Sequence, residues 1–270
     1  MGRSLARVAW AGAGTTFLAL AAQCVVGSHE SGINVSLAIA HDAHVTGASA
    51  ADGAPRTVIA NTGTVFTITR GWVVLSREEI TPCTAAKPGA VDGWRVGWGG
   101  WPPEGSAWAH SPGAPTVLGV PHVDDLLRAD DQPVEMGTIG PPPGRYCGVR
   151  VQLAPADADA EGLPRDVDVV GRTLFVEGSY EPAGGTPETF SAVSSSVSSM
   201  DVLLEEAGGP VVLDVTTGPT EVQVVLAMAY DEWFDDLDPR GLTPAELGDR
   251  ILLNVAVSLH VHSARAARSL

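Results

Sequence analysis

Hydrophobic and polar residues alternate with a period of two along most of the chain. In segment 33–39 the odd positions are Ile, Val, Leu and Ile, and the even positions are Asn, Ser and Ala. Because successive side chains of a strand point to opposite faces, this alternation predicts strands with one buried face. We predict about ten such strands. The other segments with a strand-like pattern are 57–60, 64–69, 72–76, 146–153, 173–180, 190–204, 211–215, 221–230 and 251–262.

Turns rich in Gly and Pro separate these segments, for example at 141–144 and 183–185. No long helical pattern lies between them. The chain therefore predicts an all-β fold, an antiparallel β-sandwich of the immunoglobulin-like or jelly-roll style with long loops. One or two short helices are expected, at 123–128 and 244–250. The second begins with Thr243, Pro244 and Glu246 in the arrangement of a capping box.

The first 24 residues have the layout of a signal peptide. Arg3 and Arg7 precede an apolar stretch over 8–22, about 15 residues long, whereas a membrane-spanning helix needs roughly 20. We expect residues 1–24 to be removed and 25–270 to form a single β-sandwich domain, exported to the periplasm or outer surface of a bacterium. A lipid anchor on Cys24 is the alternative to full secretion. No other segment is long and apolar enough for a transmembrane helix.

The charge balance limits the partners that the chain can bind. It has 32 acidic and 16 basic residues, a net charge of −16. This charge disfavours nucleic acid and anionic membrane surfaces and favours cations. Beyond the leader the cysteines are Cys83 and Cys147, which in an oxidising compartment are most simply read as one disulfide. Two separate buried thiols are the alternative.

Segment 84–115 departs from the strand pattern, because it is rich in Gly and Pro and contains four tryptophans. Loops of this length are uncommon unless they are functional or disordered, and four indoles argue against disorder. One interpretation is that the indoles cover one end of the sandwich. The other is a carbohydrate-binding or adhesive surface module, in which a glycan stacks on the indoles. The tryptophans are Trp94, Trp98, Trp101 and Trp108.

Histidines provide the first candidate metal ligands. His260 and His262 are two residues apart in segment 251–262, whose odd-numbered positions are apolar. If those apolar residues face the core, both imidazoles emerge on the opposite face, about 7 Å apart, where they can chelate one ion. Imidazole suits copper or zinc. Solvated surface histidines are the alternative. The other copper or zinc candidates are His41, His44, Trp108 and His110.

Two resemblances follow from these residues. The Trp108-Ala-His110 sequence, together with distant histidines, resembles the exported copper-binding proteins of methane-oxidising bacteria, the methanobactin-associated group. That resemblance implies a copper site built from two histidines and an oxidised tryptophan, kynurenine. Segments 64–83 and 144–153 are similar in style to uncharacterised bacterial lipoproteins with sandwich domains. This second likeness implies a β-sandwich fold and carries no implication for function.

An acidic loop provides a second candidate cation site. Oxygen-bearing side chains occupy the first, third, fifth and twelfth positions of the loop, and Gly162 occupies the sixth, where calcium loops turn sharply. The pattern predicts calcium, with a solvated acidic turn as the alternative. The calcium candidates are Asp157, Asp159, Glu161 and Asp168.

Enzyme motifs are absent from the sequence. It contains no Gly-x-Ser-x-Gly elbow, no phosphate-binding Gly-rich loop before a Lys and no His-Glu-x-x-His. A glycoside hydrolase remains an alternative, because it needs only two carboxylates that the fold brings together. We therefore expect an exported metal-binding protein, with a metal ion as its partner. A glycan or another envelope protein is a further partner that this interpretation allows.

Overall fold

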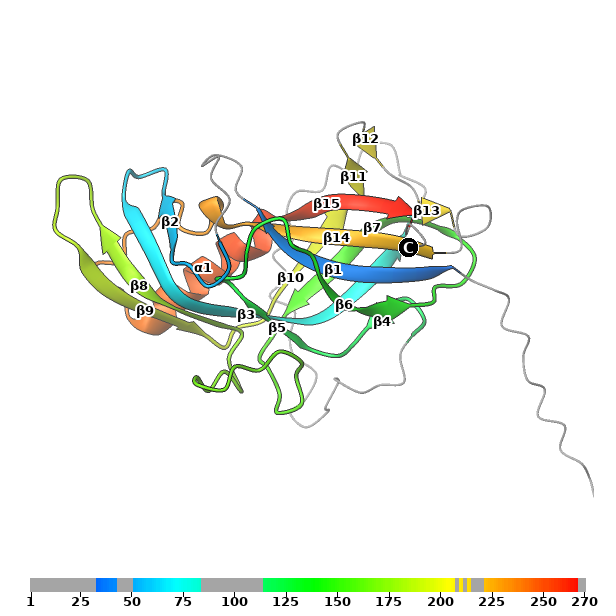
Figure 1. Cartoon of the computed structure of the whole chain (residues 1–270), viewed down its shortest axis with the longest axis horizontal. Helices are drawn as coiled ribbons and strands as arrows, with labels where there is room; N and C mark the ends of the chain where they lie inside the picture. The colour runs from blue at the N-terminus through cyan, green and yellow to red at the C-terminus, as the bar shows by residue number, and fades with distance from the viewer. Residues whose placement is uncertain are drawn as a thin grey trace, which may run out of the picture.

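The computed structural model describes residues 33–42, 51–83, 114–206, 209–210, 213–214 and 221–266. Most of them lie in strands, with one α-helix and one short 3-10 helix (Figure 1). The helices are η2 (Tyr230–Glu232) and α1 (Pro244–Ser258). The strands are β1 (Asn34–Asp42), β2 (Arg56–Ile59), β3 (Val65–Pro82), β4 (Val117–Leu118), β5 (His122–Asp125), β6 (Val134–Ile139), β7 (Arg145–Leu153), β8 (Leu174–Glu181), β9 (Glu188–Ser194), β10 (Ser198–Leu203), β11 (Glu205–Glu206), β12 (Gly209–Pro210), β13 (Leu213–Asp214), β14 (Glu221–Ala229) and β15 (Leu259–Ala266).

The strands form two main sheets, which confirms the predicted sandwich. One sheet has four strands in the order β15-β14-β1-β6, and the other has nine, with β10-β7-β3-β8-β9 as its main path. In the larger sheet β2, β4 and β5 pair with β3, and β13 pairs with β7. The pairing of β1 with β14 is parallel, and the other strand pairs of both sheets are antiparallel.

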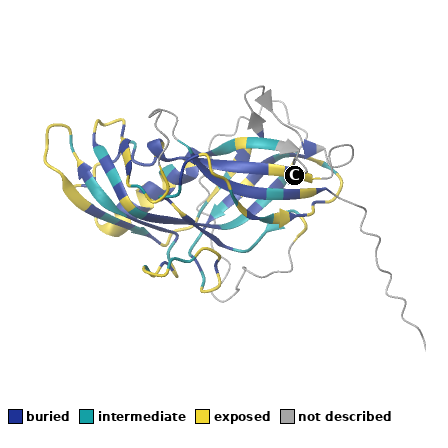
Figure 2. Ribbon diagram, in the orientation of Figure 1, coloured by how far each residue is buried: buried dark blue, intermediate teal, exposed yellow. Residues whose placement is uncertain are grey.

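The hydrophobic core lies between the two sheets. The four apolar residues of the alternating segment 33–39 are at most 4% exposed, so the predicted buried face of the first strand is confirmed. Apolar side chains from both sheets belong to the same core cluster, and buried positions follow the central strands in both layers (Figure 2). Burial of these side chains supplies the main driving force for folding.

The long strand β3 organises the larger sheet. It spans 18 residues and pairs with β2, β4, β5, β7 and β8. The sequence pattern divides this strand into two segments, 64–69 and 72–76, because the alternation is interrupted near Gly71. In the structure the strand continues through that point, with register shifts between Ile68 and Arg70 and between Leu75 and Arg77. Such irregularities bend a strand without ending it.

The strand predicted at 251–262 is wrong over its first two thirds. Helix α1 extends to Ser258, and β15 begins only at Leu259. Apolar residues at odd positions resemble a strand, but Leu252 and Ala256 are also apolar and buried, which gives the spacing of a helix face. Leu253 and Val257 are 43% and 45% exposed, so the odd positions do not share one buried face.

The helix start was predicted correctly. Thr243 caps the helix, and its hydroxyl accepts a hydrogen bond from the Glu246 backbone N–H at 3.3 Å. The Glu246 carboxylate accepts in return from the Thr243 backbone N–H at 2.9 Å. The helix packs against β9, where Gly248 lets the two backbones approach, because a Cβ on Gly248 would lie 2.2 Å from the Val193 carbonyl oxygen.

The helix predicted at 123–128 is also wrong. Residues His122–Asp125 form β5, which pairs with Trp72 to Leu75 of β3, and the chain turns after it. A segment of six residues is too short to form a stable helix on its own, so pairing with the available edge of β3 determines its conformation.

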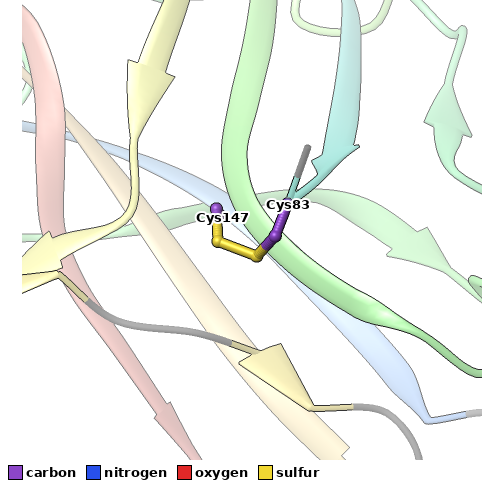
Figure 3. Close-up of a disulfide and its surroundings, with 2 residues drawn as sticks. All are labelled: Cys83 and Cys147. Atoms are coloured by element: carbon purple, nitrogen blue, oxygen red, sulfur yellow. A yellow bond between two sulfur atoms is a disulfide. The ribbon is translucent and has the colours of Figure 1, made fainter. Parts of the chain in front are cut away.

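Cys83 and Cys147 form the predicted disulfide, with their Cα atoms 4.9 Å apart (Figure 3). The bond joins the end of β3 to β7, two strands that also pair directly. Within the described residues, no helix combines the length and apolar character that crossing a membrane requires.

Candidate functional site

The end of β1 places two consecutive polar residues on opposite faces of the four-stranded sheet. Val35, Leu37 and Ile39 face the core, so His41 continues that inner face and Asp42 projects outward. Each residue belongs to a different group of polar side chains. The inner group bridges the two sheets, and the outer group contains two of the predicted metal ligands.

His41 is fully buried, and both nitrogens of its ring contact charged side chains. Its Nε2 lies 2.6 Å from Asp124 Oδ2, and its Nδ1 lies 3.1 Å from Arg56 Nη2. A guanidinium can only donate, so Nδ1 accepts and Nε2 carries the proton donated to Asp124. Asp124 comes from β5 of the other sheet, so this bond joins the two layers. The structure thus places His41 in the core, with both ring nitrogens engaged.

Arg56 is the centre of the same buried polar cluster. Its guanidinium donates to Asp130 and to the backbone carbonyls of Leu126 and Arg128. It also stacks over the ring of Tyr230, with its Cζ atom 4.2 Å from the ring centroid. The Tyr230 hydroxyl donates to Asp130 Oδ2 at 2.9 Å. We define the buried polar cluster as His41, Arg56, Asp124, Arg128, Asp130 and Tyr230.

Charge is balanced within this cluster. Arg128 lies 2.8 Å from Asp124, so two guanidinium groups face two carboxylates. Burial alone would raise the pKa of Asp124, but its interactions with His41 and with the Arg128 guanidinium outweigh burial and lower that pKa. The Asp124 carboxylate is therefore ionised at neutral pH.

The outer group is the surface cluster of Asp42, His260 and His262. Asp42 Oδ2 lies 3.0 Å from His260 Nε2 and 3.8 Å from His262 Nδ1. The His260, His262 and Asp42 side chains are 33%, 42% and 17% exposed. The strand order explains why these three side chains lie close together. Strand β14 lies between β15, which carries both histidines, and β1, which carries Asp42. The predicted outward projection of both imidazoles from one strand is therefore observed, although that strand starts later than predicted.

A register shift brings the second histidine into the surface cluster. His260 is opposite Ala227 of β14, whereas the pairing skips from Val261 to Ser263 and leaves His262 in the irregularity. Asp42 is opposite Ala229 of the same strand. An irregularity of this kind changes the direction in which a side chain projects from the strand.

Hydrogen bonding determines the protonation state that His260 prefers. Its Nδ1 lies 3.1 Å from the Ser258 carbonyl oxygen, which can only accept, and its Nε2 faces the Asp42 carboxylate. The hydrogen bond to Asp42 raises the pKa of His260, burial opposes this, and the Ser258 carbonyl adds to the rise. The imidazolium form is thus stabilised relative to an exposed histidine.

The other histidine and tryptophan candidates, His44, Trp108 and His110, lie outside the described residues, as do Cys24 and the other tryptophans of segment 84–115. Residues 1–24, predicted as a signal peptide, also lie outside them.

The acidic loop is described. Asp159, Glu161 and Asp168 are exposed, and Asp168 accepts a hydrogen bond from the Val170 backbone N–H at 3.1 Å. Gly162 has a φ of 80°, as a sharp turn there requires. Across the described part of the chain, no group of three or more His, Cys, Asp or Glu side chains is positioned to hold a metal ion.

Sequence reasoning missed Glu78, the most isolated polar group among the described residues. Its side chain is fully buried in the larger sheet, and neither carboxyl oxygen has a hydrogen-bond partner within the described part of the chain. Burial raises the pKa of Glu78 from 4.5 to about 8. A signal was present, because Glu78 is two residues before the apolar Ile80 and so belongs to the same face of the strand.

No known family model, curated protein or solved structure matches this chain.

Proposed function

We propose that this chain is an exported protein that binds a transition-metal ion, copper or zinc, through the imidazoles of His260 and His262. The observation that carries the proposal is the convergence of both rings on one carboxylate oxygen of Asp42. Two imidazoles and a carboxylate are a common ligand set for such ions. The rings are partly exposed, so an ion can reach them from solvent.

The chemistry of the cluster suits a cation that competes with protons. Imidazole binds a metal only in its neutral form, so an ion would displace the proton between His260 Nε2 and Asp42. Both rings approach Asp42, but the three side chains are not positioned to hold an ion as they stand, so binding requires rotation of the side chains. Asp42 would then add an oxygen ligand, and the Ser258 carbonyl oxygen at His260 Nδ1 would orient that ring. The net charge of −16 favours the approach of a cation.

The disulfide supports the exported location in this proposal. Disulfides persist in oxidising compartments and are rare in the cytosol of most organisms. The carbohydrate-binding alternative depends on tryptophans outside the described residues and stays a prediction, as does calcium binding by the acidic loop. The hydrolase alternative gains no support from Asp124 and Asp130, because both carboxylates are buried and paired with guanidinium groups.

The test is metal binding by the purified chain after equilibrium dialysis against copper or zinc, measured by elemental analysis. We expect about one ion per chain for the parent and loss of that ion in the double variant His260→Ala/His262→Ala. Asp42→Asn should weaken binding by roughly 10- to 100-fold, because it removes the charge of an oxygen ligand. Ser263→Ala, on the same strand, is the matched control and should bind like the parent.

Two results would contradict this proposal. One is a parent chain that takes up neither copper nor zinc at stoichiometric level. The other is a double variant that retains the parent's metal content, which would place the site elsewhere. Circular dichroism of each variant confirms that the fold is retained.

A further inference from the structure

A row of apolar side chains crosses the larger sheet and is interrupted by a single carboxyl group. Glu78 of β3 is directly opposite Leu118 of β4 on one side and Val151 of β7 on the other. Met200 of β10 is opposite Val151 in turn. Directly opposed residues on adjacent antiparallel strands project from the same face. Leu118, Val151 and Met200 all belong to the hydrophobic core or pack against it, so Glu78 faces the core as well.

Among the residues that the structure describes, no charged group offsets the burial of Glu78. Its neighbour on the same face of β3 is Ile80, which is opposite Val149 of β7. The charged neighbours Arg77, Glu79 and Arg150 are partly or fully exposed, and Arg150 pairs with Asp201 there. From the facing sheet, β1 contributes Val35 and Leu37 to the core and β6 contributes Met136 and Ile139, and none of these side chains titrates. Burial is the cause of the raised pKa of Glu78.

Strand β4 covers this carboxyl with few contacts of its own. It has two residues, and in the described sheet it pairs only with β3. The Ile80 backbone N–H donates to the Thr116 carbonyl at 3.0 Å just before β4. Leu118 packs over Gly137 of β6, where a Cβ would lie 2.7 Å from a Leu118 methyl group. Short edge segments with few buried contacts open at low free-energy cost.

We propose that Glu78 is a proton-dependent lock that holds β4 against the core. The neutral carboxyl is tolerated in the apolar row, whereas an ionised carboxylate without a partner is not. Loss of the proton drives the carboxylate toward water past Leu118, and β4 separates from β3. The lock is independent of the surface cluster and of any metal bound there.

The direction of the pH effect follows from the raised pKa. The folded chain keeps the Glu78 proton up to about pH 8, whereas the open form loses it near the ordinary value of 4.5. The stabilisation by this group is fully present below about pH 4.5, declines as pH rises, and is lost above about pH 8. The pKa difference of about 8 minus 4.5 allows the opening equilibrium to increase by at most about three thousandfold.

Hydrogen exchange of the full chain between pH 6 and 9.5, read at the backbone amides of Leu118 and Ile80, tests the lock. The Glu78→Gln substitution keeps the shape of the side chain, but the new side chain cannot ionise. After correction for intrinsic exchange, we expect the parent to lose protection at these amides as pH rises, by tenfold or more. The Glu78→Gln variant should lose little protection at the same amides over this pH range. Glu79→Gln, at the adjacent residue with a partly exposed side chain, is the matched control and should follow the parent.

Either of two outcomes would overturn the lock. In the first, Glu78→Gln loses protection at β4 with the same pH profile as the parent. In the second, protection falls equally across β7, β8 and β14, which would show global unfolding and no local release. If Glu78→Gln does not fold, Glu78→Leu replaces it. The carboxyl carbon shift of Glu78 in the parent, followed by NMR, must also titrate near pH 8 and not near 4.5.

Discussion

Individual charged side chains are buried in this protein by two different means. Arg56 lies in the core because it meets Asp130, two backbone carbonyls and the face of Tyr230. Glu78 has no such partners in the described ranges and is accommodated by keeping its proton. A paired charge and a neutralised acid both avoid the large cost of an isolated buried ion. The two sites therefore respond to different perturbations, one to mutation of a partner and the other to pH.

Removing the Arg56 guanidinium should leave Asp130 as a buried carboxylate without its cation. We expect Arg56→Met to lower the free energy of unfolding by about 3–5 kcal/mol, measured by urea denaturation. Adding Asp130→Asn should recover part of that loss, because no uncompensated charge remains. Arg150→Met is the control, since Arg150 and Asp201 are 54% and 61% exposed, and it should cost at most about 1 kcal/mol. An equal loss of unfolding free energy in Arg56→Met and Arg150→Met would contradict this account of the buried polar cluster.

Among the elements, α1 and β15 show how one apolar pattern divides into a helix and a strand. Ile251, Val255 and Leu259 are all buried, yet the helix ends between the last two. The helix packs on β9, and the strand completes the edge of the four-stranded sheet beside β14. The change at Leu259 directs His260 and His262 toward Asp42. The position of the helix end thus determines whether the surface cluster forms.

The capping box is expected to stabilise α1 measurably. Thr243→Ala removes the hydroxyl that accepts from the Glu246 N–H, and we expect it to lower the free energy of unfolding by about 1 kcal/mol. Thr243→Ser keeps the hydroxyl and should cost only a few tenths of that amount. Thermal unfolding followed by circular dichroism measures both changes. If the Ala and Ser variants unfold together, the hydroxyl does not stabilise the helix.

On the scale of the whole molecule, links between distant segments hold the two layers and the long strand together. The bond between His41 and Asp124 joins the sheets across 83 positions of sequence. The disulfide joins β3 to β7 across 64 positions. A crosslink between distant positions restricts the unfolded chain, and in the chain-entropy description its effect grows slowly with the length of the loop it closes.

The disulfide should therefore make a large contribution to stability. We expect Cys83→Ala/Cys147→Ala to lower the free energy of unfolding by about 2–5 kcal/mol in guanidinium titrations. Reduction of the parent should produce a loss of similar size, and the double variant should be insensitive to reductant. An unchanged midpoint after complete reduction would show that the bond does not stabilise the fold.

Much of the fold could be predicted from the sequence because its signals are local. Alternation in segment 33–39 predicts the buried face of β1, and Thr243 with Glu246 predicts the start of α1. The pairing of Cys83 with Cys147 follows from their number and from the chemistry of an oxidising compartment. Each of these inferences needs only neighbouring residues or a residue count. The helix predicted at 123–128 was wrong because β3 pairs with that run.

Which polar groups lie close together depends on the tertiary structure. Asp42 and His260 are 218 positions apart, and the order of β1, β14 and β15 brings their side chains to 3.0 Å. The same pairing placed His41, two residues beyond the predicted strand, inside the core. Glu78 is buried because β4 and β7 both pair with β3 beside it. Strand order and register arise from the packing of the whole core, so a local pattern determines the face of a residue but not its neighbours.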